Sequence, residues 1–377
     1  MYHQAETTPT GRQPQRPRTH RTRYALRGWL ALQLVLAALV LTAAPAQARP
    51  DRSPCVRRDL PVTLTPGPAI RYRLAGWLCQ PRHPANTVQL LVAGLTYTHR
   101  YWTGPGHRTD QVAAALAAGN AVYMIDRIGT GASDRPPADQ VTVATEATVT
   151  HQAVHALRNG TLGRYTHVAG VGHSYGSVVW MAEAATHHDI DALILTGLLH
   201  DIDLDAMTRF TTDLHPAADD PAFAHTTTPA GYLTTRPGSR GTYFLDPDTA
   251  VPGAAGWDET TKTTATTGEL TFTPEQEFAY SRAITVPVLL VVGTHDALFC
   301  GAALQCSRPA DICQRERGAF PASTALTAIT VAATGHSINL HTSATPTHTL
   351  INTWLDRTTH GPAPASCSPR PLTNTSQ

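Results

Sequence analysis

The chain has 377 residues, of which 42% are hydrophobic and 15% are charged, a composition that fits one large globular domain or two ordinary ones. Its formal net charge of +1 lacks the basic excess that a nucleic-acid partner would require. Lysine occurs once, as Lys262, while arginine, alanine and threonine are frequent, a usage typical of GC-rich genomes.

The first 48 residues have the layout of an export signal. Six arginines precede an apolar run over residues 28–44, and Ala46-Gln47-Ala48 follows it. We therefore expect residues 1–48 to be a secretory signal peptide that is cleaved before Arg49, so that the protein is secreted. The alternative is an uncleaved segment that anchors the protein to the membrane. No later stretch is long and apolar enough to cross a bilayer, so no stable membrane span is expected after cleavage.

All six cysteines lie beyond the expected cleavage point: Cys55, Cys79, Cys300, Cys306, Cys313 and Cys367. An even number of cysteines in an exported chain predicts disulfides. The sequence favours one pair, Cys55 with Cys79, which bracket a short strand-turn-strand segment, and leaves the other pairings open. The spacing of Cys300, Cys306 and Cys313 matches no Cys-x2-Cys pair, so zinc is the less favoured alternative and no metal site is expected.

From residue 69 onward, short apolar runs alternate with helical stretches, which is typical of an α/β protein with a mostly parallel central sheet flanked by helices. The expected elements, in chain order, are strand 88–93, helix 109–118, strand 121–125, helix 144–158, strand 166–171, helix 177–186, strand 192–195, strand 286–292, strand 330–333 and helix 344–356.

Between Gly197 and Ile284 this alternation gives way to a region rich in threonine, proline, aspartate and glycine, with scattered aromatic residues. We expect residues 198–283 to form a cap inserted into a core made of residues 49–197 and 284–356, with a C-terminal tail at 357–377. The alternative is a long disordered linker.

Gly172-His173-Ser174-Tyr175-Gly176 stands where the strand over 166–171 meets the helix over 177–186. A strand that reverses sharply into a helix holds its middle residue in a strained conformation, and glycine on both sides relieves the collisions. The Ser174 hydroxyl is then exposed above the sheet. This context predicts a nucleophilic serine.

A serine nucleophile needs a base and an acid that orients the base. Asp296 follows the strand over 286–292, and His336 follows the strand over 330–333, so both are expected at the edge of the sheet where Ser174 lies. Asp201 and Asp203, after the strand that ends near Thr196, are alternative acids. Asp296 is preferred because its strand is clearer and its position in the chain fits.

The order Ser174, Asp296, His336 is that of an α/β-hydrolase triad. The stretch Asp126-Arg127-Ile128-Gly129-Thr130-Gly131-Ala132-Ser133 is similar to the Asp-x-x-Gly-x-Gly-x-Ser segment of that family. From about Val88 to Leu355 the chain resembles an α/β-hydrolase. The resemblance implies the α/β-hydrolase fold and a structural role for Asp126.

The resemblance also implies the roles of the site residues. Ser174 attacks a carbonyl, His336 takes its proton, and Asp296 orients His336. The oxyanion hole consists of the backbone N–H groups of Tyr175 and Leu95, with Thr96 as the alternative to Leu95, because Ala93-Gly94 replaces the usual His-Gly. The implied substrate is a small or medium-sized ester, less readily an amide.

No cofactor is expected, since Gly129-Thr130-Gly131 lies in a loop without the pattern of a dinucleotide site. Two other functions stay open: non-hydrolytic use of the fold, as in an acyltransferase, cyclase or lyase, and a binding protein without catalysis, which the complete triad disfavours.

Several further residues were weighed. His173 is expected to pack beneath the serine turn, and His187-His188-Asp189 to be the polar end of a helix rather than a metal site. His295 and His341 flank the site without an assigned role. Four residues after the oxyanion loop are candidates for either an acyl pocket or the core: Tyr97, His99, Tyr101 and Trp102.

Overall fold

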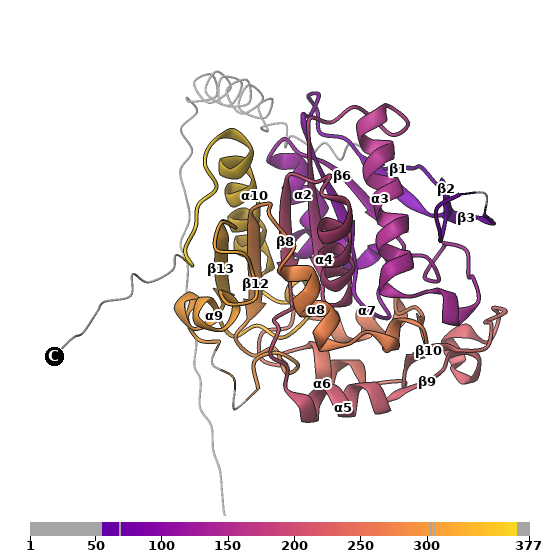
Figure 1. Cartoon of the computed structure of the whole chain (residues 1–377). Coiled ribbons are helices and arrows are strands. Elements are labelled where there is room, and N and C mark those ends of the chain that lie inside the picture. Colours follow the sequence, from indigo (N-terminus) through magenta and orange to yellow (C-terminus); the bar gives the residue numbers. More distant parts are fainter. Residues whose placement is uncertain (1–54, 68, 302–303, 305, 368–377) are drawn as a thin grey trace, which may run out of the picture. The chain divides into compact units, whose positions relative to one another are not determined.

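The computed structural model describes residues 55–67, 69–301, 304 and 306–367. The expected signal peptide, residues 1–48, lies outside the described residues. Over the described part, an eight-stranded sheet has helices on both faces (Figure 1). The predicted α/β-hydrolase fold, with its mostly parallel central sheet, is confirmed.

The strand order in the sheet is β1-β4-β6-β5-β7-β8-β12-β13. β4 pairs antiparallel with β1 and β6, and the pairs from β6 to β13 are parallel. A separate two-stranded sheet is formed by β2 and β3. The strands of these two sheets are β1 (Val56–Arg57), β2 (Leu60–Thr63), β3 (Arg71–Leu74), β4 (Gly76–Cys79), β5 (Thr87–Val92), β6 (Ala121–Ile125), β7 (His167–His173), β8 (Ala192–Thr196), β12 (Val288–Gly293) and β13 (Leu326–Val331).

The parallel strands form because both of their faces are covered. Every residue of β5, β6, β8 and β12 is buried. Continuous apolar sequences such as Val-Leu-Leu-Val-Val in β12 suit strands that are buried on both sides.

Helices α3 (Val143–Asn159) and α4 (Tyr175–His187) pack against each other, and α2 (Gln111–Ala117) packs against α10 (Ala344–His360). Figure 1 shows α4 in front of the sheet and α10 behind it. Side chains define the helix starts: Asp110 accepts a hydrogen bond from the Ala113 N–H (2.8 Å) at the N-terminus of α2. Helix α9 (Pro309–Glu316) packs beside β13.

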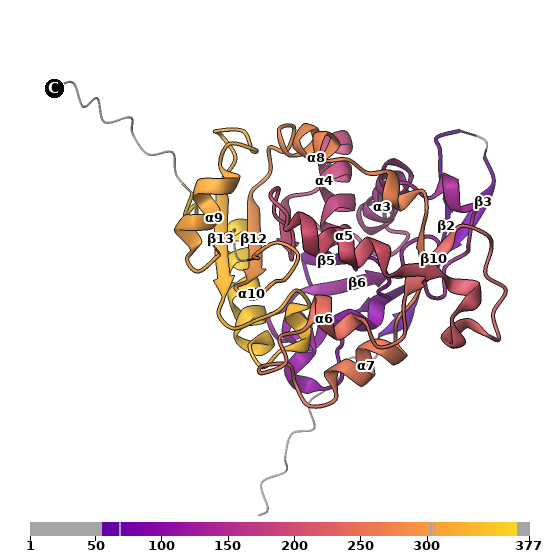
Figure 2. The same ribbon diagram turned by 90° about the horizontal axis from the view of Figure 1, so that it is seen from below.

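The inserted segment, residues 198–283, is folded. It contains a three-stranded antiparallel sheet in the order β11-β10-β9 and four helices. In Figure 2, α5, α6, α7 and β10 lie in front of the central sheet. Its elements are α5 (Leu204–Thr212), β9 (Leu214–Pro216), β10 (Tyr232–Thr235), α6 (Arg240–Phe244), α7 (Ala254–Thr260), β11 (Ala265–Thr266) and α8 (Pro274–Ser281).

Of the expected elements only strand 121–125 has its expected bounds; the others are shifted, and three of the shifts bear on the site or on the expected tail. β13 ends at Val331 rather than Ala333, because Ala333 turns the chain with a φ of 46°. α4 begins directly after Ser174, two residues earlier than expected. α10 continues to His360, past the expected start of the tail.

Three disulfides join the cysteines: Cys55–Cys79, Cys300–Cys306 and Cys313–Cys367. The predicted pairing of Cys55 with Cys79 is confirmed. Three disulfides fit a protein that folds in an oxidising compartment. Within the described ranges, no helix has the length and apolar character needed to cross a membrane.

Candidate active site

Ser174 lies at a sharp turn between β7 and α4. Its φ of 54° and ψ of −124° are strained for a residue with a side chain. A Cβ atom at Gly172 would lie 2.5 Å from Ser177 Cα, and one at Gly176 would lie 2.0 Å from Val92 O. Only glycine fits at these two positions, which is why both flank the serine.

Asp296 and His336 form a buried pair. His336 Nδ1–H donates to Asp296 Oδ2 at 2.8 Å, and both side chains are 0% exposed. Asp296 Oδ1 accepts from the N–H groups of Leu298 (2.9 Å) and Phe299 (3.3 Å), which hold the carboxyl group in this orientation. With Nδ1 protonated, His336 Nε2 is left as the acceptor nitrogen.

The serine is less closely joined to this pair. Among the described residues no hydrogen bond links Ser174 to His336, and His336 Nε2 has no partner. The His336 ring lies 5.8 Å, centroid to centroid, from the Phe299 ring. Phe299 lines the same cavity as Ser174. In hydrolases the serine–histidine bond is often long until substrate binds.

The alternative acids serve other contacts. Asp203 accepts a hydrogen bond from the Ala206 N–H (2.9 Å) at the start of α5, and Asp201 pairs with Arg315 (3.3 Å). Neither contacts His336. Of the three candidate acids, Asp296 is therefore the one that contacts His336 in the structure.

The two expected oxyanion donors, Tyr175 and Leu95, line the cavity beside Ser174. Tyr175 is the first residue of α4, whose N-terminus favours negative charge. The loop after β5 is pressed against the serine, since a Cβ at Gly94 would lie 2.9 Å from Ser174 Cβ. No hydrogen bond among the described residues uses the Leu95 N–H. It is free to donate to a ligand.

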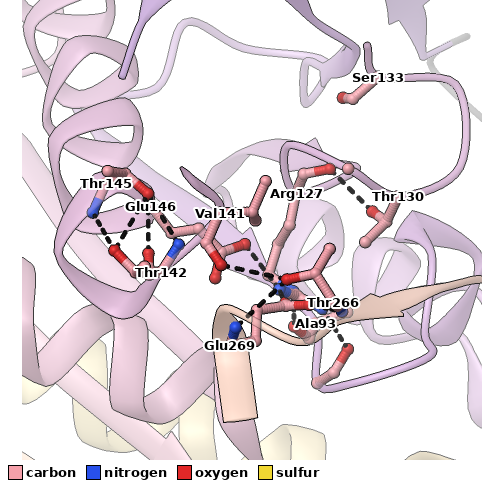
Figure 3. A network of polar contacts seen from close by, with 12 residues as sticks. Ala93, Arg127, Thr130, Ser133, Val141, Thr142, Thr145, Glu146, Thr266 and Glu269 are labelled. Atoms are coloured by element: carbon pink, nitrogen blue, oxygen red, sulfur yellow. Dashed lines mark hydrogen bonds and ion pairs between the residues drawn. The ribbon is translucent and has the colours of Figure 1, made fainter. Parts of the chain in front are cut away.

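The guanidinium of Arg127 is hydrogen-bonded to this loop (Figure 3). Its Nε donates to Ala93 O at 2.9 Å and its Nη2 to Gly94 O at 3.2 Å. Its Nη1 donates to Glu146 (2.6 Å) and to Glu269 of the inserted segment. The whole group is buried, and burial raises the pKa of Glu146 to about 8 although Arg127 opposes this. Glu146 therefore tends to keep its proton at neutral pH.

Arg240 ties the inserted segment to the other side of the loop. It forms a bidentate ion pair with Asp258, in which Nε donates to Oδ2 at 2.8 Å and Nη2 to Oδ1 at 3.0 Å. Its Nη1 donates to Thr96 Oγ1 at 2.7 Å. Its guanidinium lies 4.5 Å from the centre of the Tyr97 ring. Arg127 and Arg240 were not predicted as supports of the site; only Arg127 had a signal in the sequence, its place directly after Asp126 in the Asp-x-x-Gly-x-Gly-x-Ser motif.

A cavity of about 240 Å³ opens at Ser174. Its walls come from the core and the inserted segment, and most of them are apolar. They include Leu95, Tyr97, Val178, Leu198, Met207, Phe210, Phe244, Leu270, Phe272 and Leu298; the ionisable groups on the wall, other than tyrosines, are His200, Glu269 and Glu277.

Of the four aromatic candidates, only Tyr97 lines this cavity, and its hydroxyl lies 2.6 Å from Ser337 Oγ. His99 instead contacts Asp126 (2.8 Å) and stacks on Trp77. Tyr101 and Trp102 are 1% and 0% exposed within the core. An acyl-pocket role is thus wrong for these three residues, because none of them lines the cavity: Tyr101 and Trp102 are core residues and His99 is bound to Asp126.

Two histidines support the site from behind. His173 stacks on Tyr101 at 4.3 Å and is buried, which lowers its pKa well below the usual range, so its expected packing role is confirmed. His341 Nε2 accepts the N–H groups of Asp246 (2.9 Å) and Gly335 (3.2 Å), and so orients the loop that carries His336. Sequence analysis gave His341 no role. His295 pairs with Asp246.

The group His151, Glu183 and Asp189 is the one described set that could chelate a metal ion. His187 stacks on His151 at 3.8 Å, while His151 Nδ1 lies 2.7 Å from Asp189 Oδ2. Burial and a hydrogen bond with Asp189 raise the pKa of Glu183 to about 10. Glu183 therefore keeps its proton at neutral pH.

Comparisons with known proteins agree with the fold. Residues 89–346 match the α/β hydrolase family, and the chain belongs to that family. No curated protein sequence gives a significant match.

Solved structures with the same fold include a lipase in its open form (17% identity, TM-score 0.56, covering 81% of this chain and 100% of that one). A monoacylglycerol lipase of Paleococcus ferrophilus is similar at 16% identity and a TM-score of 0.53, covering 76% of this chain and 99% of that one. Epoxide hydrolase A of Mycobacterium thermoresistibile is similar at 16% identity and a TM-score of 0.51, covering 80% and 98%.

Proposed function

We propose that the protein is a serine hydrolase that cleaves an ester bond, less readily an amide bond, of a small or medium-sized molecule. The observation that carries the proposal is the strained serine at the wall of an apolar cavity, in a chain whose buried Asp296–His336 pair leaves the histidine Nε2 free. An exposed hydroxyl, a base and an orienting carboxylate are the components of nucleophilic acyl transfer.

In the proposed reaction His336 Nε2 takes the proton of Ser174 as Oγ attacks the ester carbonyl carbon. The N–H groups of Tyr175 and Leu95 hold the oxygen that becomes negative. His336 then gives its proton to the leaving alcohol, and an acyl-enzyme remains. Water attacks this acyl group, His336 takes a proton from the water, and Ser174 recovers the proton as the acid leaves.

The inserted segment acts as a cap that selects the substrate. It supplies Met207, Phe210 and Phe272 to the cavity, so the part of the substrate away from the ester is largely apolar. The cavity volume of about 240 Å³ limits that part to a small or medium-sized group. The disulfides and the arginine-rich, apolar N-terminus support secretion.

The test is labelling of the mature, oxidised protein with a fluorophosphonate probe, read by intact mass, together with hydrolysis of p-nitrophenyl esters. Wild-type protein is expected to gain one label, and Ser174→Ala none. His336→Ala and Asp296→Asn are expected to lower kcat by about 10³-fold or more. Unchanged esterase activity in all three variants would disprove the triad.

A further inference from the structure

The cavity at Ser174 has a polar region in an otherwise apolar wall. Glu277, on α8, lines the cavity and is 7% exposed. Its Oε1 is buried without a hydrogen-bond partner, and no described hydrogen bond or ion pair uses either oxygen of its carboxyl group. α8 packs against α4, the helix that begins beside Ser174.

The neighbouring polar groups satisfy one another. His200 Nδ1 lies 2.6 Å from Glu316 Oε2, and His200 Nε2 lies 2.9 Å from Ser281 Oγ. The His200 N–H donates to Glu316 Oε1 at 3.1 Å. Burial lowers the pKa of His200, but the nearby carboxyl groups of Glu316, Glu277 and Asp201 raise it more, so that the net change is a rise. Glu277 therefore interacts with His200 through its charge, but its carboxyl group makes no described hydrogen bond.

A buried carboxyl group without a partner is unfavourable, and native proteins rarely keep one. Burial raises the pKa of Glu277 to about 7 even though His200 counteracts it. Near neutral pH the group therefore changes readily between its neutral and charged forms. A partner that enters through the cavity would remove the cost of burial.

We propose that Glu277 is a binding subsite for a cationic nitrogen at the non-reacting end of the substrate. This rests on the proposed function, because it places that end in the cavity where Ser174 attacks. A protonated amine forms a charge-assisted hydrogen bond with a carboxylate, about twice as strong as a neutral one. The apolar wall accommodates the carbon chain between the amine and the ester. The substrate is thus an ester of an amine-bearing acid or alcohol.

The first experiment compares esters of equal length that end in methyl, ammonium, hydroxyl or carboxylate groups, in one series on the acyl side and in another on the alcohol side. In one of the two series, the ammonium ester is expected to exceed the methyl ester at least tenfold in kcat/KM, mainly through a lower KM. Glu277→Gln is expected to abolish this preference, mainly by raising the KM of the ammonium ester.

Glu275→Gln is the matched control, since Glu275 is exposed on the same helix, and it is expected to keep the preference. If methyl esters are hydrolysed but neither series prefers ammonium, or if Glu277→Gln keeps the preference, the proposal is wrong.

A second measurement needs no ester hydrolysis. Isothermal titration with n-hexylammonium and n-hexanol is expected to show at least tenfold tighter binding of the ammonium by wild-type protein, and equal binding by Glu277→Gln. Equal binding of both probes by wild type would overturn the subsite even in an active hydrolase. Tight ammonium binding without ester hydrolysis would keep the subsite and disprove the proposed reaction.

Discussion

Arg127 is the residue that connects the loop beside Ser174 with the rest of the fold. It donates to the carbonyls of Ala93 and Gly94, which precede the expected oxyanion donor Leu95. It also binds Glu146 of α3 and Glu269 of the inserted segment. A planar guanidinium can reach two carbonyls and two carboxyl groups at once, whereas an ammonium group cannot. Arg127 is thus a positioning residue for the oxyanion loop.

We expect Arg127→Lys to lower kcat for an ester substrate by tenfold or more with little change in KM, because the charge stays but the loop loses its two carbonyl contacts. Steady-state kinetics measures this, with circular dichroism to check folding. Arg282→Lys, at an exposed arginine, is the control. A higher KM with an unchanged kcat would contradict the positioning role.

The residues of the candidate site differ in how far sequence could predict them. Ser174, Asp296 and His336 were found because each follows a strand, and strand ends meet at one edge of a parallel sheet. Arg240 and His341 were not found, since their partners Thr96 and Asp246 lie far away in the sequence. No local pattern marks a contact that exists only after folding.

Among the elements, the apolar parallel strands were predictable and the inserted segment was not. β6 has its expected bounds because five consecutive apolar residues are buried on both faces. β13 is shifted because its register is set by pairing with β12, from Val288 beside Leu326 to Gly293 beside Val331. In the inserted segment the helices and strands are short and polar, so their stability comes from packing and not from periodicity.

Two of the disulfides are expected to affect different properties. Cys300–Cys306 follows Asp296, whose C=O accepts the Cys300 N–H at 2.8 Å, and closes a loop with a sequence separation of 6. Cys313–Cys367 ties the chain after α10 to α9, with a separation of 54. On the chain-entropy model the short loop contributes about 2 kcal/mol to stability and the long loop about 4 kcal/mol.

We therefore expect Cys313→Ser/Cys367→Ser to lower the Tm more than Cys300→Ser/Cys306→Ser does. The latter pair should instead lower kcat several-fold, because Leu298 and Phe299, which bind Asp296, lie next to Cys300. Thermal unfolding and ester hydrolysis of both double variants test this. A larger loss of activity on removing the distant disulfide would contradict the expectation.

For the whole molecule, stability depends on buried groups that stay uncharged. Burial raises the pKa of Glu183 to about 10 and that of Glu146 to about 8, both from an ordinary 4.5. Burial lowers the pKa of His348 from 6.5 to about 4, and those of His173 and His341 in the same direction. The two glutamates and the three histidines therefore change the stability of the protein in opposite directions as the pH changes.

The sign for each set follows from proton binding. In the unfolded chain Glu146 and Glu183 release their protons above pH 4.5, whereas in the folded protein they keep them up to about pH 8 and about pH 10, respectively. These two residues therefore lower the free energy of unfolding as the pH rises from 4.5 to those values. In the unfolded chain His348 takes up a proton below pH 6.5, whereas in the folded protein it does so only below about pH 4. The free energy of unfolding therefore falls as the pH falls from 6.5 to about 4. We expect the Tm to be highest between about pH 4.5 and 6.5, where the two trends cancel.

Glu183→Gln isolates the alkaline part of this profile. Glutamine is neutral at every pH and has nearly the same shape as glutamic acid, so the variant avoids the cost of protonating residue 183 on folding. Its Tm is expected to be within about 1 °C of wild type at pH 5 and at least about 3 °C higher at pH 9, with exposed Glu275→Gln unchanged at both. Parallel Tm curves for wild type and Glu183→Gln would mean that Glu183 is ionised in the folded protein. A metal ion at His151, Glu183 and Asp189 would then be the better explanation, and chelator treatment would lower the wild-type Tm alone.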